Sequence, residues 1–142
     1  MKKPPPETPD FDTTPFVTRT RGIVISVVPL YDQARSKPTA GAYIYGYHVD
    51  ISNEGKETVQ LISRHWIIRD GFGETEHVAG EGVVGHQPVL EPGMRFRYAS
   101  FCPLKTPTGT MEGTYRMLRQ GTTDSFDAVI GRFDLKNPDL MN

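Results

Sequence analysis

The chain has only one cysteine, Cys102, among its 142 residues. A single cysteine cannot form an intrachain disulfide, so nothing in the sequence requires an oxidising compartment. Charge of one sign is not in excess either, because 16 basic residues stand against 17 acidic ones and leave a net charge of −1. Domains that bind nucleic acid usually carry a basic excess, so nucleic acid is not expected as a partner.

Long apolar runs are also missing. The best of them, residues 22–28, is far shorter than the roughly 18 residues that a membrane-spanning helix needs. Three prolines follow Met1, Lys2 and Lys3 where a signal peptide would have its apolar region. We therefore expect a cytoplasmic protein without membrane insertion. Apolar residues at helical spacing are absent as well, which excludes an amphipathic helix as the main element.

What the sequence does contain is a series of short segments in which apolar and polar residues alternate. The clearest is 42–53, where Tyr43, Tyr45 and Tyr47 share one face. Further strands are expected at 17–28, 58–70, 74–78, 94–101, 110–119 and 126–135. Segment 58–70 is apolar on both faces, so it should be a central strand, with Trp66 in the core. The turn residues at 53–56 predict that it pairs with 42–53 as a hairpin.

About seven or eight short strands separated by glycine and proline turns are typical of an all-β fold. We predict an antiparallel β-sandwich of the immunoglobulin or fibronectin type III class, with a closed barrel as the alternative. One such domain should occupy residues 16–136, since this length suits a single core. Residues 1–15 hold five prolines and are predicted to be a disordered tail, and 137–142 to be a C-terminal tail.

Residues 80–93 hold four glycines and two prolines, a composition that excludes both a helix and a long strand. We predict that this stretch bends the chain between two groups of strands. Its first part is the candidate site for a ligand or partner, namely Gly80, Glu81, Gly82, Val83, Val84, Gly85 and His86.

The same glycines match the G-x-G-x-x-G pattern of dinucleotide-binding loops. In that fold a helix begins at the last glycine, but here Pro88 follows Gly85 by three residues. Glycine amides in a curved loop can still bind an anion as a nest. Nucleotide or pyrophosphate binding at Gly80–Gly85 is therefore kept as an alternative, with Arg95 and Arg97 as the basic residues in reach.

Metal binding is the second alternative, and it depends on four histidines. His77 and His86 flank the glycine stretch with Glu81, and these three are the candidate ligands for Co²⁺ or Mg²⁺. His48 and His65 are predicted to face each other across the first hairpin. No resident cofactor is predicted.

Catalysis is not indicated by the remaining reactive side chains. Ser63, His65 and Asp70 are close in sequence, but a triad requires side chains that converge. Cys102 is expected to be a small buried residue without a reactive thiolate. We therefore predict no catalytic residue and a protein that is not an enzyme.

Several runs in this chain, taken in order, resemble the ApaG family. They are 64–71 (RHWIIRDG), 78–88 (VAGEGVVGHQP), 90–93 (LEPG), 98–100 (YAS) and 109–115 (GTMEGTY). The resemblance covers roughly residues 16–136 and implies a fibronectin-type sandwich. It also implies kinship with domains that bind protein partners in some eukaryotic F-box and polymerase-interacting proteins. Bacterial members carry the label of a cobalt and magnesium efflux protein, and without a membrane span any such role would be indirect.

A module for protein–protein interaction is thus the predicted function. The binding surface is expected to be an exposed sheet edge or the loop at 80–88. Five tyrosines could supply contact area or fill the core, namely Tyr43, Tyr45, Tyr47, Tyr98 and Tyr115. The sequence names no partner, and a homo-oligomer is compatible with it.

Overall fold

The computed structural model describes residues 14–137. The expected tails at 1–15 and 137–142 therefore lie outside the described residues, except for positions 14, 15 and 137. The β-branched and aromatic segments form nine strands, and the only helix of the described part is a 3₁₀ turn, η1 (Pro38–Ala40). The strands are β1 (Phe16–Thr20), β2 (Ile23–Tyr31), β3 (Tyr43–Asn53), β4 (Val59–Asp70), β5 (Thr75–Glu81), β6 (Val89–Leu90), β7 (Arg95–Leu104), β8 (Gly109–Arg119) and β9 (Ser125–Leu135).

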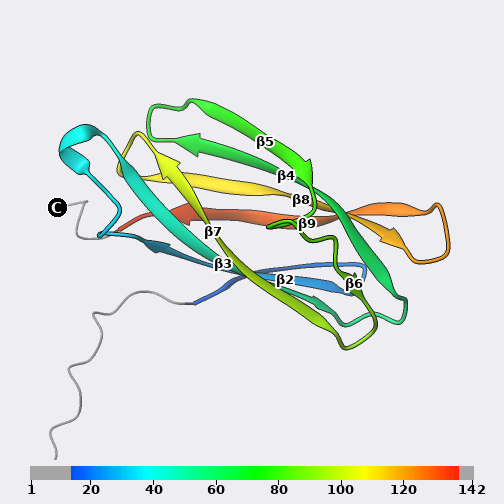
Figure 1. Cartoon of the computed structure of the whole chain (residues 1–142). Coiled ribbons are helices and arrows are strands. Elements are labelled where there is room, and N and C mark those ends of the chain that lie inside the picture. Colours follow the sequence, from blue (N-terminus) through cyan, green and yellow to red (C-terminus); the bar gives the residue numbers. More distant parts are fainter. Residues whose placement is uncertain (1–13, 138–142) are drawn as a thin grey trace, which may run out of the picture.

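The strands form two antiparallel sheets packed face to face (Figure 1). The first sheet has the order β1-β2-β3-β7, and the second has the order β5-β4-β8-β9, with the short β6 added to β4. The predicted all-β sandwich is therefore confirmed. Two separate sheets replace the closed barrel that was the alternative. Strand β4 lies between β5 and β8, so its predicted central position is confirmed too.

The single strand predicted at 17–28 is wrong, because the chain reverses in its middle. Arg21 and Gly22 have positive φ angles of 49° and 82°, and β1 folds back to pair with β2. Gly22 and the polar residues Thr18 to Arg21 mark this turn in the sequence, but β-branched residues on both sides of it suggested one continuous strand. Pro29 does not end the strand either, since β2 continues to Tyr31. β1 pairs with β2 only as far as Val27, so one side of β2 is unpaired at Pro29, and the missing N–H of the proline leaves no partner strand without a hydrogen bond.

The predicted hairpin between 42–53 and 58–70 is also wrong. β3 pairs with β2 and β7, whereas β4 belongs to the other sheet, so the residues between them cross from one sheet to the other. Asn53 fixes the crossing: its Nδ2 donates to the carbonyl oxygens of Glu57 and Leu90, each at 2.8 Å. Its Oδ1 accepts the N–H of Gly55 at 2.9 Å. Polar and glycine residues suit such a crossing as well as they suit a hairpin turn.

Trp66 fills the centre of the core, as predicted. Its ring meets those of Tyr47, Tyr115 and Phe133 edge-on, with centroid separations of 5.4, 6.1 and 6.1 Å. Edge-to-face packing of this kind adds to the stabilisation from apolar burial. Tyr45 and Tyr47 are buried in the same core, so these two tyrosines of β3 pack the fold, while Tyr43 is partly buried against it.

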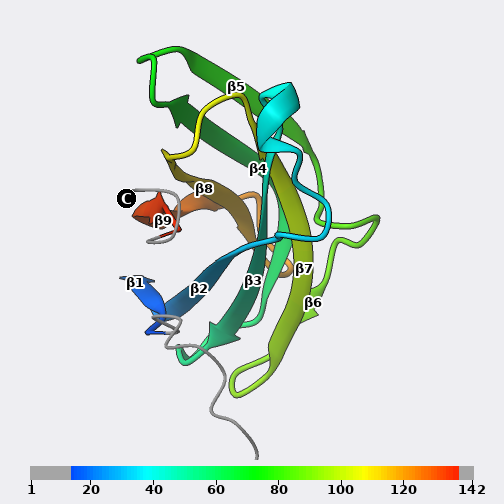
Figure 2. The ribbon, with the colours of Figure 1, turned by 90° about the vertical axis from the view of Figure 1, so that its left-hand side faces the viewer.

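Along one side of the sandwich, the edge strands of the two sheets are hydrogen-bonded to each other. Thr18 and Thr20 of β1 accept the backbone N–H groups of Gly131 and Val129 in β9, at 2.9 and 3.1 Å from nitrogen to hydroxyl oxygen. Figure 2 shows β1 beside β9 on this side of the sandwich. On the opposite side, β5 and β7 are the outermost strands of their sheets.

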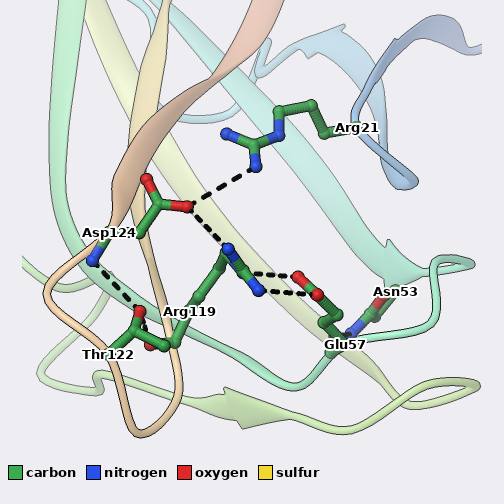
Figure 3. A network of polar contacts seen from close by, with 6 residues as sticks. All are labelled: Arg21, Asn53, Glu57, Arg119, Thr122 and Asp124. Atoms are coloured by element: carbon green, nitrogen blue, oxygen red, sulfur yellow. Dashed lines mark hydrogen bonds and ion pairs between the residues drawn. The ribbon is translucent and has the colours of Figure 1, made fainter.

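An ion-pair network connects three turns at one end of the sandwich (Figure 3). Arg119 donates from Nη2 to Glu57 Oε1 at 2.7 Å and from Nη1 to Asp124 Oδ2 at 2.9 Å. Arg21 approaches the same Asp124 oxygen at 3.7 Å. The hydrogen bond from Arg119 is the main cause of a lowered pKa of Asp124. These side chains are between 32% and 56% exposed, so the network links the turns but contributes little to stability per pair.

Candidate functional site

The glycine stretch forms a tight two-residue turn. Val83 and His86 exchange two backbone hydrogen bonds, of 2.8 and 2.9 Å, and Val84 and Gly85 between them have φ angles of 44° and 83°. Positive φ at both central positions is the signature of a type I′ turn. β6 then follows, so the helix that a dinucleotide-binding loop requires at Gly85 is not formed. The chain bends here, but the turn joins β5 to β6, which both pair with β4, so the passage to the other sheet comes later in the stretch, between β6 and β7. Figure 2 shows the turn projecting from the sandwich between β5 and β6.

A β-bulge in β4 holds this turn in place. The pairing of β4 with β8 skips one residue between Leu61 and Ser63, which removes Ile62 from the ladder. The freed carbonyl oxygen of Ile62 accepts the N–H of Gly82 and the side-chain Nε2 of Gln87, both at 2.9 Å. Bulges often redirect backbone groups near functional sites, and here the bulge gives the turn two fixed attachment points.

Arg64 supplies a second clamp, which the sequence did not reveal. Its Nη1 donates to the carbonyl oxygens of Glu81 and Gly82, at 2.9 and 2.8 Å. Gly80 allows this approach, since a Cβ there would come within 3.0 Å of the guanidinium. One feature of the sequence could have indicated this role. Arg64 lies two residues before Trp66 in an alternating strand, so its charged side chain is on the same, core-facing side of a central strand.

Two adjacent valines of the turn have opposite environments. Val83 is fully buried and anchors the turn to the core, whereas Val84 is 53% exposed. A positive φ is unusual for a β-branched residue and costs conformational energy. The turn therefore displays an apolar side chain at its tip, in a strained conformation that the clamped residues on both sides maintain.

The basic residues expected near the turn lie elsewhere. Arg95 and Arg97 are on the outer face of the first sheet, where both contact Asp50, at 3.7 and 2.8 Å. Within the turn, the N–H groups of Gly82, Val83 and His86 are already used in backbone hydrogen bonds. Few donors remain to surround a phosphate.

The predicted metal ligands do not gather. His86 packs against Phe96, with ring centroids 5.7 Å apart, while His77 faces His65 on the outer side of the second sheet. Residues 14–137 contain no group of three or more His, Cys, Asp or Glu that could hold an ion. The predicted contact of His48 with His65 is wrong, because β3 and β4 belong to different sheets.

The other reactive groups serve the fold. Cys102 is buried as predicted, and burial raises the pKa of its thiol to about 12, with a smaller contribution from Glu76. Asp70 accepts the N–H groups of Phe72 and Glu74 at 2.9 and 3.0 Å, so it stabilises a turn. Burial likewise raises the pKa of Tyr115, whose hydroxyl is hydrogen-bonded to that of Tyr98.

Two antiparallel sheets packed face to face, with a clamped type I′ turn in the second of them, define a β-sandwich of the immunoglobulin and fibronectin type. Among residues 14–137, the reactive side chains do not converge into a catalytic arrangement. Comparison with protein families narrows this class. Residues 33–119 match the ApaG domain, and the chain belongs to that family, as its sequence motifs indicated.

Relatives and solved structures agree with this assignment. Protein ApaG of Maricaulis maris is 51% identical over 117 residues, covering 82% of this chain and 89% of its own length. Protein ApaG of Caulobacter vibrioides is 47% identical over 127 residues, with 89% and 90% coverage. A crystal structure from Bordetella pertussis, named for an ApaA protein, is 43% identical, with a TM-score of 0.80 and coverage of 85% and 98%. Residues 14–137 include no helix that is long and apolar enough to cross a membrane.

Proposed function

We propose that this ApaG-domain protein is a non-enzymatic module that binds a protein partner through the turn at 80–88. The surface consists of Val84 at the tip, with Glu81, Gly85 and His86 beside it. The partner would offer a small apolar pocket for the valine side chain. β5, the edge strand that leads into the turn, would extend the same surface.

The exposed, strained Val84 is the observation that supports this proposal. Asparagine and glycine suit the first position of a type I′ turn, because they tolerate positive φ. A valine there is unfavourable for folding, and its side chain gains little burial in return. Backbone strain of this kind concentrates at functional positions. A rigid turn also binds with a small loss of conformational entropy, which favours docking.

A protein partner suits this surface better than a nucleotide. Three amide N–H groups of the turn are engaged, and Arg64 directs one end of its guanidinium at backbone carbonyl oxygens. A nucleotide would need several free donors at the turn, and the basic side chain there, Arg64, is bound to carbonyl oxygens of the turn itself. The surface instead presents an apolar tip next to Glu81.

This proposal also accounts for the label of a cobalt and magnesium efflux protein that bacterial members of the family carry. The protein works in the cytoplasm, and its role in cobalt resistance and magnesium efflux is exerted through the partner. The partner, or a protein that it regulates, would carry the ions across the membrane.

Photo-crosslinking in the native cell tests the proposed surface. A photoreactive amino acid replaces Val84 in one version of the full chain and Val129 in another. Val129 is a matched control, because it is 44% exposed but lies on β9 in the second sheet. We expect one discrete crosslinked protein from position 84 and none from position 129. Equal products from both positions, or none from position 84, would contradict the proposal.

A further inference from the structure

Strand β5 has an outer edge that no other strand of residues 14–137 covers. β5 is the outermost strand of its sheet and pairs with β4 alone (Figure 1). At its two ends, Asp70 donates its N–H to the carbonyl oxygen of Glu74 at 3.0 Å, and Gly82 donates to that of Ile62 at 2.9 Å. Hydrogen-bonded pairs alternate in an antiparallel ladder, so the even-numbered residues of β5 direct their backbone groups at β4.

The odd-numbered residues therefore face outward with their backbone groups. Thr75, His77 and Ala79 each direct one N–H and one C=O away from the sheet, where a further strand can bond to them. The carbonyl oxygen of Glu81, next in this row, is already bound to Arg64 Nη1 at 2.9 Å. The open part of the edge thus runs from Thr75 to Ala79 and ends beside the turn at 80–88.

The other sheet edges are protected against strand pairing. β1 is hydrogen-bonded to β9 through Thr18 and Thr20. On β7, the N–H of Asn53 bonds to the carbonyl oxygen of Met94, so the same alternation turns the odd-numbered residues of β7 outward. Pro103 is one of them and has no N–H to offer, and an edge proline discourages pairing. β5 contains no proline, lysine or arginine.

A depression beside the open edge fits a basic side chain. It lies between β5 and β7, has a volume of about 130 Å³, and has the apolar Ile68 and Leu104 in its lining. Glu74 and Glu76 line it too, and neither is within ion-pair distance of a basic side chain in the described part of the chain. Lys105 is the one basic residue of the lining. A lysine or arginine can lay its apolar stem on such a floor and bring its charge to a carboxylate.

We propose that a basic, extended segment of the partner pairs with the outer edge of β5 as an additional strand. This inference rests on the proposed function, because the segment belongs to the same partner that contacts Val84, three residues beyond the end of β5. The backbone of the segment bonds to the three outward residues of β5, and one of its basic side chains enters the depression. A second copy of this chain is a poorer occupant, because its own β5 would bring like charges against Glu76 and Glu81.

A short peptide tests the edge in solution. The peptide alternates lysine and valine, is blocked at both ends, and has 7 residues, the length of β5. We titrate it into the isotope-labelled full chain and expect the amide NMR signals of Thr75, His77 and Ala79 to shift and to gain protection from hydrogen exchange. A peptide with glutamate in place of lysine should bind about tenfold more weakly, because it repels the carboxylates.

Several outcomes of this titration would overturn the proposal. They are no binding of the lysine peptide, equal binding of the glutamate peptide, protection on β7 in place of β5, or a dimer of the free protein that already protects β5. The measurement uses the unaltered protein, so it does not depend on the folding of a variant.

Two matched proline variants identify which edge is used. Ala79→Pro removes an outward N–H of β5 and leaves the ladder to β4 intact, and Ala99→Pro does the same on β7. Both alanines are exposed. We expect Ala79→Pro to weaken binding of the lysine peptide about tenfold and Ala99→Pro to leave it unchanged. Equal effects of the two variants would contradict strand addition to β5.

Crosslinking from position 84 in the native cell separates this inference from the proposed function. Ala79→Pro should reduce the yield of the crosslinked partner about tenfold, whereas Ala99→Pro should not change it. A full yield with Ala79→Pro would overturn strand addition, while the turn would remain the binding surface. Peptide binding at β5 without any crosslink from position 84 would contradict the turn and support the edge.

Discussion

Replacing Val84 by asparagine should make the protein more stable while it removes the proposed anchor. A residue other than glycine in the left-handed region costs about 1–2 kcal/mol, and asparagine pays least of this cost. Val84 is 53% exposed, so the substitution loses about 0.5–1 kcal/mol of stabilisation from its apolar burial. The free energy of unfolding should therefore rise by about 0.5–1 kcal/mol.

Glycine at the same position provides an internal check on this reasoning. It removes the strain completely, but it adds about 0.5–1 kcal/mol of unfolded-state entropy. Val84→Gly should therefore be close to the wild type in stability, and Val84→Asn above both. For a chain of this size, about 1 kcal/mol moves Tm by roughly 3 °C, so Val84→Asn should raise Tm by about 2–3 °C.

Thermal unfolding followed by circular dichroism, together with urea unfolding at 25 °C, measures both variants. Val129→Asn is the matched control, since Val129 is similarly exposed but has no positive φ, and asparagine fits strands poorly. We expect Val129→Asn to lose up to about 1 kcal/mol. If Val84→Asn lowered Tm as much as Val129→Asn, the inference of strain at position 84 would be refuted.

Three further predictions concern the core. Gly113→Ala should lower the free energy of unfolding in urea by more than about 3 kcal/mol, because the new Cβ would lie 2.0 Å from the His65 carbonyl oxygen. Gly46→Ala is the control, since its Cβ would have no contact shorter than 3.7 Å, and it should be neutral or stabilising. Tyr98→Phe should cost about 1–3 kcal/mol by leaving the Tyr115 hydroxyl unpaired, and the double change to Phe should cost less than the sum of the single changes; strict additivity would contradict the pairing. Because the pKa of Cys102 is raised, the folded state holds a proton that the unfolded state loses near pH 9, so stability should fall between pH 9 and 12. Cys102→Ala should make that fall less steep. An unchanged slope would contradict the raised pKa.

The sequence predicts those parts of the fold that depend on local periodicity. Strand β3 and the buried Trp66 follow from alternation of apolar residues, because one face of each strand must meet the core. The hairpin at Arg21 could not be seen in this way, since β1 has only Phe16 and Val17 as apolar residues and shows no alternation of its own. The crossing at Asn53 has the composition of a hairpin, and its true partners, Glu57 and Leu90, include one that is 37 positions away.

In the candidate site, too, local composition was informative, whereas contacts between distant residues could not be predicted. The composition of residues 80–93 predicted a shaped bend and therefore the place of Val84. The clamp by Arg64 depends on carbonyl groups 17 and 18 positions away, and the contact of His65 with His77 depends on the register of β4 against β5. A shift of one residue would move one of these histidines to the other face, so only the register reveals that they meet.

The threonine hydroxyls that join β1 to β9 have a consequence for how the protein is made. Thr18 and Gly131 are 113 positions apart, so β1 leaves the ribosome long before the strand that it contacts. At about 5–20 residues per second, β1 waits on the order of ten seconds for β9. During that interval Phe16 also lacks Phe133, whose ring lies 5.8 Å from its own in the finished domain. A nascent chain that stalls before β9 would thus keep β1 paired with β2 but leave its other edge, with Thr18 and Thr20, without a partner, so the last strand translated completes the first.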